Sequence, residues 1–203
     1  MANHYDYQGA LNAIEKRGTE LFPNFKLYEE DKLIVQQLLC YFLQDSIRAS
    51  ELGINLNKGI LLTGPVGCGK TSLISLMRFL QPQEARFMVK SCRDVSFEFI
   101  QNGYDIIHRY SHRSFYNHEP RVYCFDDLGT ENNLKFYGNQ CNIMAEILLS
   151  RYDLFVSRNL VTHLTTNLSA SEIEQLYGNR VRSRMRELFN LIAFDKTTKD
   201  KRK

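Results

Sequence analysis

An eight-residue stretch, GPVGCGKT at residues 64–71, has the residue types and spacing of a Walker A phosphate-binding loop. Its glycines let the backbone curl until successive N–H groups point at phosphate oxygens, at the positive end of a following helix. Lys70 supplies a mobile charge for the β- and γ-phosphates, and the Thr71 hydroxyl can bind Mg²⁺. Apolar residues 59–63 and 73–80 predict the strand and helix that such a loop connects. We therefore expect nucleotide contacts from Gly64, Pro65, Val66, Gly67, Cys68, Gly69, Lys70, Thr71 and Ser72.

Two adjacent acids further along the chain have the pattern of a Walker B motif. Residues 121–127 predict a buried strand that ends in the two acids, Asp126 and Asp127. Asp126 would hold Mg²⁺ through water, and Asp127 stands where a base polarises the attacking water. Because an aspartate side chain reaches less far than a glutamate, Glu131 is an alternative for the role of Asp127.

Asn167 directly follows another predicted buried strand, residues 160–166. Open parallel sheets bind ligands at the carboxyl ends of their strands, so Asn167 could contact the γ-phosphate or its attacking water. The alternative is that Asn167 is a simple turn residue between a strand and a helix.

The composition is that of a folded protein outside the membrane. The chain has 203 residues, of which 43% are hydrophobic and 12% aromatic, which suits one α/β domain. No apolar stretch approaches the roughly 20 residues of a membrane span, and the polar first residues lack a signal-peptide core. We therefore expect a cytoplasmic protein without membrane contact.

The five cysteines are scattered without a CxxC pair, which favours reduced thiols and argues against a zinc site. Cys68 lies inside the phosphate loop. A positive neighbour such as Lys70 could make its thiol reactive, but an inert loop residue is the favoured interpretation.

Ahead of the loop, the sequence predicts a small helical appendage and one long helix. Residues 1–28 carry a weak helical pattern, which Gly18 interrupts and Pro23 closes, and partner binding is one role for them. Residues 29–52 have a stronger amphipathic pattern, with acids at the start and Gly53 at the end.

Between the two Walker motifs, residues 86–90 predict a short strand. Asp94 should then cap a helical region that runs to about Tyr110 with a break near Gly103. Near the end of the chain, residues 190–194 predict the last strand.

A basic and aromatic cluster lies at the end of that helical region: His108, Arg109, Tyr110, His112 and Arg113. Such a cluster could hold the backbone of a single-stranded nucleic acid and stack its bases, and a solvated helix end explains it equally well. His108 and His112 have helical i, i+4 spacing, but without the glutamate of a metalloprotease helix we do not expect a metal there.

Four arginines occupy alternate positions near the C-terminus. On a helix, Arg180 and Arg184 share one face, and Arg182 and Arg186 share another. One pair can therefore face a ligand while the other contacts solvent or acids.

The order of these motifs resembles the DnaC/IstB family of AAA+ ATPases, the bacterial helicase loaders and ATP-binding partners of transposases. The resemblance rests on GPVGCGKT, on DDLG at residues 126–129, on TTN at residues 165–167 and on NRVRSRM at residues 179–185. It covers about residues 55–203.

The resemblance assigns further roles to single residues. It implies that Asn167 is the sensor 1 residue and that Arg184 is an arginine finger for the ATP of a neighbouring subunit, with Arg180 beside it. Arg202, beyond the last predicted strand, is the candidate for the sensor 2 arginine.

The resemblance also implies an α/β P-loop fold of the AAA+ type, with a parallel five-stranded sheet in the order 51432 flanked by helices. Residues 1–28 would be a helical extension and residues 29–203 the ATPase domain, with little or no C-terminal lid. The implied activity is ATP hydrolysis with Mg²⁺, weak in a monomer because the arginine finger comes from a second subunit.

The implied role is to load a replicative helicase onto single-stranded DNA, with ATP-dependent self-association. Within the family, the alternative is a transposition partner that binds duplex DNA. Outside it, the alternatives are a P-loop small-molecule kinase and an adaptor that binds ATP without hydrolysing it. A GTPase is disfavoured because no NKxD motif follows the predicted Walker B strand.

Overall fold

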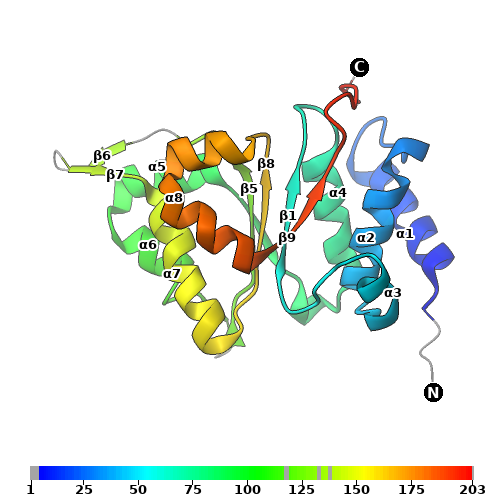
Figure 1. Cartoon of the computed structure of the whole chain (residues 1–203), viewed down its shortest axis with the longest axis horizontal. Coiled ribbons are helices and arrows are strands. Elements are labelled where there is room, and N and C mark those ends of the chain that lie inside the picture. The colour runs from blue at the N-terminus through cyan, green and yellow to red at the C-terminus, as the bar shows by residue number, and fades with distance from the viewer. Residues whose placement is uncertain (1–4, 117–118, 132–133, 137–138, 203) are drawn as a thin grey trace. The chain divides into compact units, whose positions relative to one another are not determined.

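The computed structural model describes residues 5–116, 119–131, 134–136 and 139–202. Five parallel strands form a sheet in the order β2-β5-β8-β1-β9 (Figure 1). Their bounds are Gly59–Thr63 for β1, Met88–Ser91 for β2, Tyr123–Leu128 for β5, Thr162–Thr166 for β8 and Phe189–Ala193 for β9. Counting only these five strands along the chain, the order from β9 is 51432. The predicted α/β fold and strand order are therefore confirmed.

The chain divides into two compact units, and β1 and β9 run from one unit into the other. The first unit contains residues 1–56, 62–86 and 192–203, and the second contains residues 57–61 and 87–191. Residues 5–28 belong to the same unit as the phosphate loop.

The first unit is helical around the phosphate loop. Helices α1 and α2 both pack against α4, the helix that follows the loop (Figure 1). The helices are α1 Tyr7–Leu21, α2 Lys32–Phe42, α3 Ser46–Glu51 and α4 Lys70–Met77, with 3-10 turns at Glu29–Asp31, Arg78–Leu80 and Gln83–Ala85.

Gly18 does not interrupt α1, contrary to the prediction. The helix continues through it to Leu21, and Gly18 is buried. A Cβ atom at this position would lie 2.1 Å from Cδ1 of Phe25. The glycine therefore permits a close approach of the Phe25 ring and does not break the helix.

The single helix predicted for residues 29–52 is also wrong, because α2 and α3 are separate. Gln44 between them has a φ of +58°, which lies outside the right-handed helical region. The Asp45 carboxylate then accepts a hydrogen bond from the N–H of Arg48 at 3.0 Å and caps α3. A side-chain cap thus starts a new helix where the amphipathic pattern continues.

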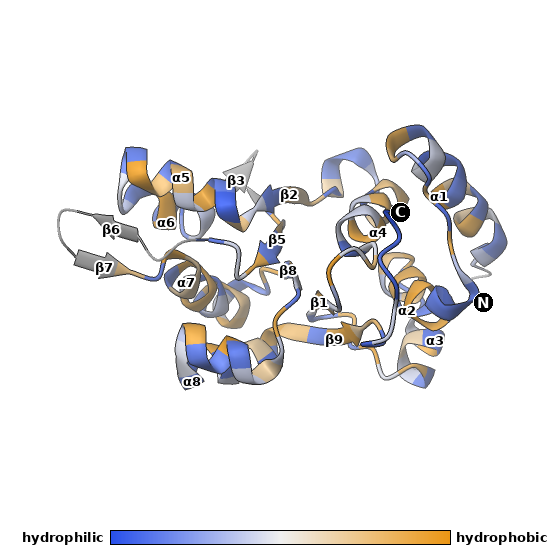
Figure 2. Cartoon of the chain, turned by 90° about the horizontal axis from the view of Figure 1, so that it is seen from above, coloured by the Kyte–Doolittle hydropathy of each residue, from blue (hydrophilic) through white to orange (hydrophobic). Residues whose placement is uncertain are grey.

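The second unit packs four helices and β5 around one hydrophobic core. Figures 1 and 2 show these helices together beside β5 and β8. The helices are α5 Cys92–Asn102, α6 Asp105–Tyr110, α7 Ile143–Arg158 and α8 Ala170–Leu188. Two short hairpins pair β3 Phe115–Tyr116 with β4 Glu119–Pro120, and β6 Leu134–Phe136 with β7 Asn139–Cys141.

The cap of α5 differs from the predicted one. The Ser91 hydroxyl accepts a hydrogen bond from the N–H of Asp94 at 3.4 Å, so Ser91 is the N-cap and Asp94 lies in the first turn. The predicted break is confirmed, because Gly103 ends α5 with a φ of +60°.

Among the helices of the described residues, none combines the length and the apolar character needed to cross a bilayer.

Candidate nucleotide-binding and hydrolysis site

The phosphate loop connects β1 to α4 in the first unit. Gly67 and Gly69 have φ angles of +80° and +98°, in the left-handed region that L side chains rarely adopt. Gly69 is the N-cap of α4, so the helix begins at Lys70. A helix N-terminus favours anions through its dipole and its outermost N–H groups. The predicted strand, loop and helix are all present, and the local geometry suits a phosphate.

The loop's own backbone holds the Lys70 side chain. Lys70 is 5% exposed. Its ammonium group donates hydrogen bonds to the carbonyl oxygens of Gly64 at 3.0 Å and Pro65 at 2.9 Å. These bonds fix a positive charge at the loop. Of the other predicted contacts, Val66 and Thr71 are exposed and Ser72 is half-buried.

The Cys68 thiol is buried in the loop, 3.8 Å from the Lys70 ammonium nitrogen. Burial raises the pKa of this thiol above its usual value, although the Lys70 charge acts in the opposite direction. Only the thiolate is a good nucleophile, so Cys68 is an unreactive thiol at neutral pH. This supports the interpretation of Cys68 as an inert loop residue.

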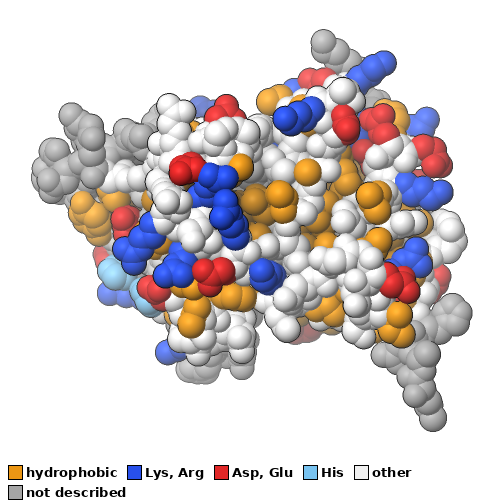
Figure 3. All heavy atoms as spheres, viewed as in Figure 1, with side chains coloured by type: hydrophobic (Ala, Val, Ile, Leu, Met, Phe, Trp, Pro, Cys, Tyr) orange, Lys and Arg blue, Asp and Glu red, His pale blue; other side chains and the backbone are white. Residues whose placement is uncertain are grey.

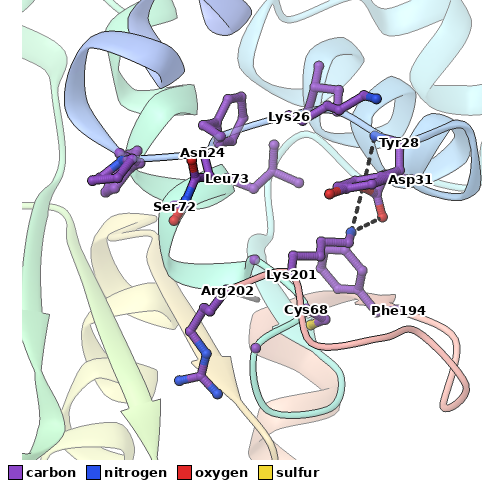
Figure 4. Close-up of a pocket in the computed structure, with 16 residues that line it drawn as sticks. Asn24, Lys26, Tyr28, Asp31, Cys68, Ser72, Leu73, Phe194, Lys201 and Arg202 are labelled. Atoms are coloured by element: carbon purple, nitrogen blue, oxygen red, sulfur yellow. Dashed lines mark hydrogen bonds and ion pairs between the residues drawn. The ribbon is translucent and has the colours of Figure 1, made fainter.

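A pocket of about 230 Å³ lies beside the loop in the first unit. Figure 4 shows the residues that line it, which come from residues 22–28, Asp31, the phosphate loop, α4 and the segment after β9. Aromatic residues among them are Phe22, Phe25, Tyr28 and Phe194. Sequence reasoning missed this pocket. Phe22, Phe25 and Tyr28 recur at a spacing of three, which a helical pattern explains as well as a binding site does.

Lys201 fastens the C-terminal segment to this unit. Its backbone N–H donates to the carbonyl oxygen of Gly67 at 3.0 Å. Its ammonium lies 2.6 Å from both carboxylate oxygens of Asp31, a side chain that is only 5% exposed (Figure 4). The same ammonium lies 5.1 Å from the centre of the Tyr28 ring. The chain after β9 therefore passes over the phosphate loop.

Arg202, the candidate sensor 2 arginine, also lines the pocket. Its Nε and Nη2 atoms donate to the Asp200 carboxylate at 2.9 and 2.7 Å. In Figure 4 its guanidinium group points away from the ion pair of Lys201 and Asp31. Of these two basic residues near the C-terminus, Lys201 has the more buried side chain and Arg202 has the more exposed one.

The two acids of the predicted Walker B motif lie in the second unit, at the end of β5. The register of the pairing between β5 and β8 shifts between Phe125 and Leu128, so a β-bulge or similar irregularity occurs at the two acids. Asp127 has a φ of +57° in the left-handed region, whereas Asp126 is a buried residue. A strained backbone of this kind is common where a side chain must be aimed at a ligand.

Thr165 on β8 contacts both acids. Its hydroxyl donates to Oδ1 of Asp126 at 2.6 Å and accepts the N–H of Asp127 at 2.8 Å. Sequence reasoning missed this residue, because a buried threonine in a strand normally indicates only packing.

Glu131, the alternative to Asp127, is held by other residues of the second unit. The Tyr177 hydroxyl donates a hydrogen bond to Oε1 of Glu131, and the Gly129 N–H donates to Oε2 at 2.9 Å. Burial and the neighbouring Glu131 carboxylate raise the pKa of Tyr177, so Tyr177 remains a donor. These bonds give Glu131 a structural role, which favours Asp127 for contact with water.

Asn167 is exposed in the turn directly after β8. It lies before Ser169, which caps α8 together with Glu172. The predicted position at the carboxyl end of a parallel strand is therefore correct.

The arginines of α8 lie beyond a kink at Gly178, where φ is +84°. Arg184 donates to the Tyr152 hydroxyl at 2.9 Å and pairs with Glu187 at 3.1 Å. Arg182 pairs with Glu174. Figure 3 shows Lys and Arg side chains gathered over α8, and Figure 2 shows that much of this helix is hydrophilic. Arg180 is exposed and makes no ion pair with any residue in the described ranges.

The basic and aromatic cluster lies at the end of α6. Arg109, His112 and Arg113 are exposed, and the two arginines pair with Glu98 at 3.4 Å and Asp105 at 3.5 Å. Tyr110 is instead buried. Its hydroxyl donates to Glu98 at 2.9 Å and its ring packs edge-on against core rings of β5. The exposed part of the cluster is therefore cationic and contains no tyrosine ring.

No protein-family model and no curated protein matches the sequence. Solved structures do match the fold. The crystal structure of the DnaC helicase loader matches with a TM-score of 0.60 at 16% identity, over 93% of this chain and 99% of that one. The chain has a DnaC-like AAA+ fold.

Two other solved structures share this AAA+ fold. A protein assigned to the primosome, from Streptococcus pyogenes serotype M3, matches with a TM-score of 0.58 at 16% identity, over 96% of this chain and all of that one. AMPPCP-bound DnaA from Aquifex aeolicus matches with a TM-score of 0.56 at 17% identity, over 84% of this chain and 48% of that one.

The donor atoms of this chain suit Mg²⁺. Among the described residues, no group of three or more His, Cys, Asp or Glu side chains could hold a metal ion by itself. Thr71 in the first unit offers a hydroxyl, and Asp126 in the second unit offers a carboxylate. These are hard oxygen ligands of the kind that Mg²⁺ takes together with phosphates and water.

Proposed function

We propose that this chain is an ATP-binding and ATP-hydrolysing AAA+ protein that loads a replicative helicase onto single-stranded DNA. One observation carries the proposal: a buried lysine is held at a glycine-rich loop. That loop stands on a fold shared with the DnaC helicase loader over nearly the full length of both chains.

The nucleotide would bind with its phosphates on the loop. Lys70 and the N-terminus of α4 would bind the β- and γ-phosphates, and Thr71 and Asp126 would hold Mg²⁺. When bound, Mg²⁺ neutralises charge that develops on the transferred phosphoryl group. The aromatic pocket beside the loop is of a kind that suits a nucleobase.

Hydrolysis would use the carboxyl ends of β5 and β8. Asp127 would accept a proton from the attacking water, and Asn167 would orient that water. Arg184, with Arg180 on the same helix, would reach the ATP of a second copy, so the protein would self-associate with ATP. An arginine finger of this kind increases the rate of hydrolysis by about 10³- to 10⁵-fold, and an isolated subunit should therefore hydrolyse ATP slowly.

The exposed side chains of Arg109, His112 and Arg113 would contact the backbone of single-stranded DNA. Because Tyr110 is buried, this contact would be mainly electrostatic and would weaken with salt. Residues 1–28 would take part in binding the helicase.

The test measures binding of fluorescent single-stranded DNA at several salt concentrations, with ATP and Mg²⁺. We expect the Arg109→Ala, Arg113→Ala double variant to weaken binding and reduce its salt dependence. Lys16→Ala removes an exposed lysine on α1 as the matched control and should bind normally. Absence of binding at low salt would contradict the DNA role, and a preference for duplex would favour a transposition partner.

A second arm captures the replicative helicase with the wild-type chain and with Lys70→Ala. We expect ATP-dependent capture by the wild type only. A product phosphorylated on an acceptor other than water would instead indicate a small-molecule kinase.

A further inference from the structure

Thr165 uses both hydrogen-bonding functions of its hydroxyl on the two acids of β5. The O–H donates to Asp126 Oδ1 at 2.6 Å, and the oxygen accepts the N–H of Asp127 at 2.8 Å. Thr165 is fully buried on β8. The bond to Asp126 is buried and the bond to Asp127 is part-buried. A buried hydrogen bond to a charged group is strong.

The first bond orients a carboxylate. An ionised aspartate has two oxygens with about four lone-pair positions that can accept hydrogen bonds, and rotation about χ2 is soft. The Thr165 hydroxyl occupies one position on Oδ1 of Asp126. It thereby restricts which lone pairs of Asp126 remain to face a cation or its water ligands.

The second bond stabilises an unusual backbone. Asp127 has a φ of +57°, and a left-handed conformation costs a non-glycine residue free energy. The pairing of β5 with β8 shifts register at this point, so Asp127 does not continue the regular ladder. The Thr165 oxygen accepts the N–H of Asp127 there.

We propose that Thr165 is a positioning residue for Mg²⁺ binding and ATP hydrolysis. It fixes the Asp126 carboxylate for Mg²⁺ and the Asp127 backbone for the attacking water. This proposal rests on the proposed ATPase function. It names a residue outside the Walker and sensor positions, and its role follows from the two bonds alone.

Strand β8 supplies its own matched control. Thr162 and Thr166 are buried threonines on the same strand. The Thr162 hydroxyl accepts from Arg151 Nε at 2.6 Å, and the Thr166 hydroxyl donates to the carbonyl oxygen of Leu128 at 2.7 Å. All three threonines satisfy a buried hydrogen bond, and Thr165 is the one that contacts the acids.

The experiment compares Thr165→Val, Thr165→Ser and Thr166→Val in the full chain. Two readouts are taken: binding of a fluorescent ATP analogue titrated with Mg²⁺, and ATP turnover with single-stranded DNA present. Loss of a residue that orients a metal ligand typically costs about 10- to 100-fold in metal affinity or activity. For Thr165→Val we therefore expect the half-saturating Mg²⁺ concentration to rise at least about tenfold.

Turnover of Thr165→Val should fall by a similar factor, while affinity for the analogue in EDTA stays unchanged. Thr165→Ser keeps the hydroxyl and should restore both readouts. Thr166→Val loses a buried hydrogen bond of the same kind and should leave the Mg²⁺ titration as in the wild type.

An unshifted Mg²⁺ titration for Thr165→Val, or an equal shift for Thr166→Val, would overturn the role of Thr165. A wild-type chain that binds ATP with Mg²⁺ but does not hydrolyse it would overturn the ATPase function and the role of Thr165 in hydrolysis, while the Mg²⁺ titration would still test the role of Thr165 at Asp126. If the wild-type chain does not bind ATP, or if its ATP binding does not depend on Mg²⁺, both proposals would be overturned.

Discussion

The phosphate loop and the acidic end of β5 hold their charged groups by different means. At the loop, two backbone carbonyl oxygens hold the Lys70 ammonium, and glycines with positive φ shape the chain. At the end of β5, a buried side chain has this role, since the Thr165 hydroxyl forms hydrogen bonds with both acids. The first region is built from backbone and the second from side chains. A loop whose shape is set by its backbone requires only a few residue types at a fixed spacing. A side-chain network instead requires contacts between residues that are far apart in the sequence.

The largest expected effect tests whether the second region depends on buried side chains. Arg151 is fully buried and donates to Thr162 Oγ1 and to the carbonyl oxygens of Tyr110, Arg121 and Val161. Arg151→Ala leaves these acceptors without their donor and opens a cavity, so we expect a loss of about 3–5 kcal/mol in unfolding free energy. Denaturant unfolding measures it.

The control for this change is Arg186→Ala, which removes an exposed arginine of α8 and should change stability by less than about 0.5 kcal/mol. If Arg151→Ala loses less than about 1 kcal/mol, the second region does not depend on this network.

The next expected effect is a dependence of the unfolding free energy on pH. His163 on β8 is buried and accepts the N–H of Ile60 at Nδ1, 3.1 Å away. Burial and, to a lesser extent, the Arg151 charge lower the pKa of His163 from 6.5 to about 3. Between these values the unfolded chain binds more protons, so the stability that neutral His163 contributes is lost as pH falls. The slope for one proton is at most about 1.4 kcal/mol per pH unit.

His163→Asn keeps an acceptor for Ile60 and cannot titrate. Unfolding measured from pH 7 to pH 4 should therefore show a shallower loss of stability in this variant than in the wild type. Equal slopes would mean that His163 is not kept neutral in the fold.

The smallest expected loss of stability is at the phosphate loop, whose shape is set by its backbone. Gly69 has a φ of +98°, and the nearest atom to an added Cβ is Cδ of Lys201 at 3.9 Å. Gly69→Ala should therefore lose about 1–2 kcal/mol through backbone strain alone. Gly178, with a φ of +84° and open space around it, is the matched control.

Gly178→Ala should lose at least as much stability in thermal unfolding, because its φ of +84° and ψ of 160° lie in a region that is essentially restricted to glycine. Only Gly69→Ala should also weaken binding of a fluorescent ATP analogue. If Gly178→Ala weakens analogue binding equally, that loss reflects general destabilisation and not the shape of the loop.

The same contrast explains what the sequence could predict. The loop, its flanking strand and helix, and the position of Asn167 follow from local patterns. The two helix errors came from single contacts: the Phe25 ring against Gly18, and the cap that Asp45 places on α3. Neither contact changes the apolar periodicity, so neither could be predicted from it.

The site residues that were missed depend on contacts between distant segments. Asp31 and Lys201 are 170 positions apart, and Thr165 is 39 positions from Asp126. Nothing in the sequence near these residues distinguishes them from an ordinary surface lysine or a buried strand threonine.

The most direct test of the central claim separates binding from turnover in one pair of variants. Analogue binding and ATP hydrolysis are measured with Mg²⁺ and single-stranded DNA for Lys70→Ala and Asp127→Asn. Lys70→Ala should lose about tenfold or more in affinity, because a charge-assisted contact to phosphate is removed. Asp127→Asn should bind like the wild type and lose turnover. If Asp127→Asn hydrolyses ATP at the wild-type rate, or Lys70→Ala binds as tightly as the wild type, the assignment of the two regions to binding and hydrolysis is contradicted.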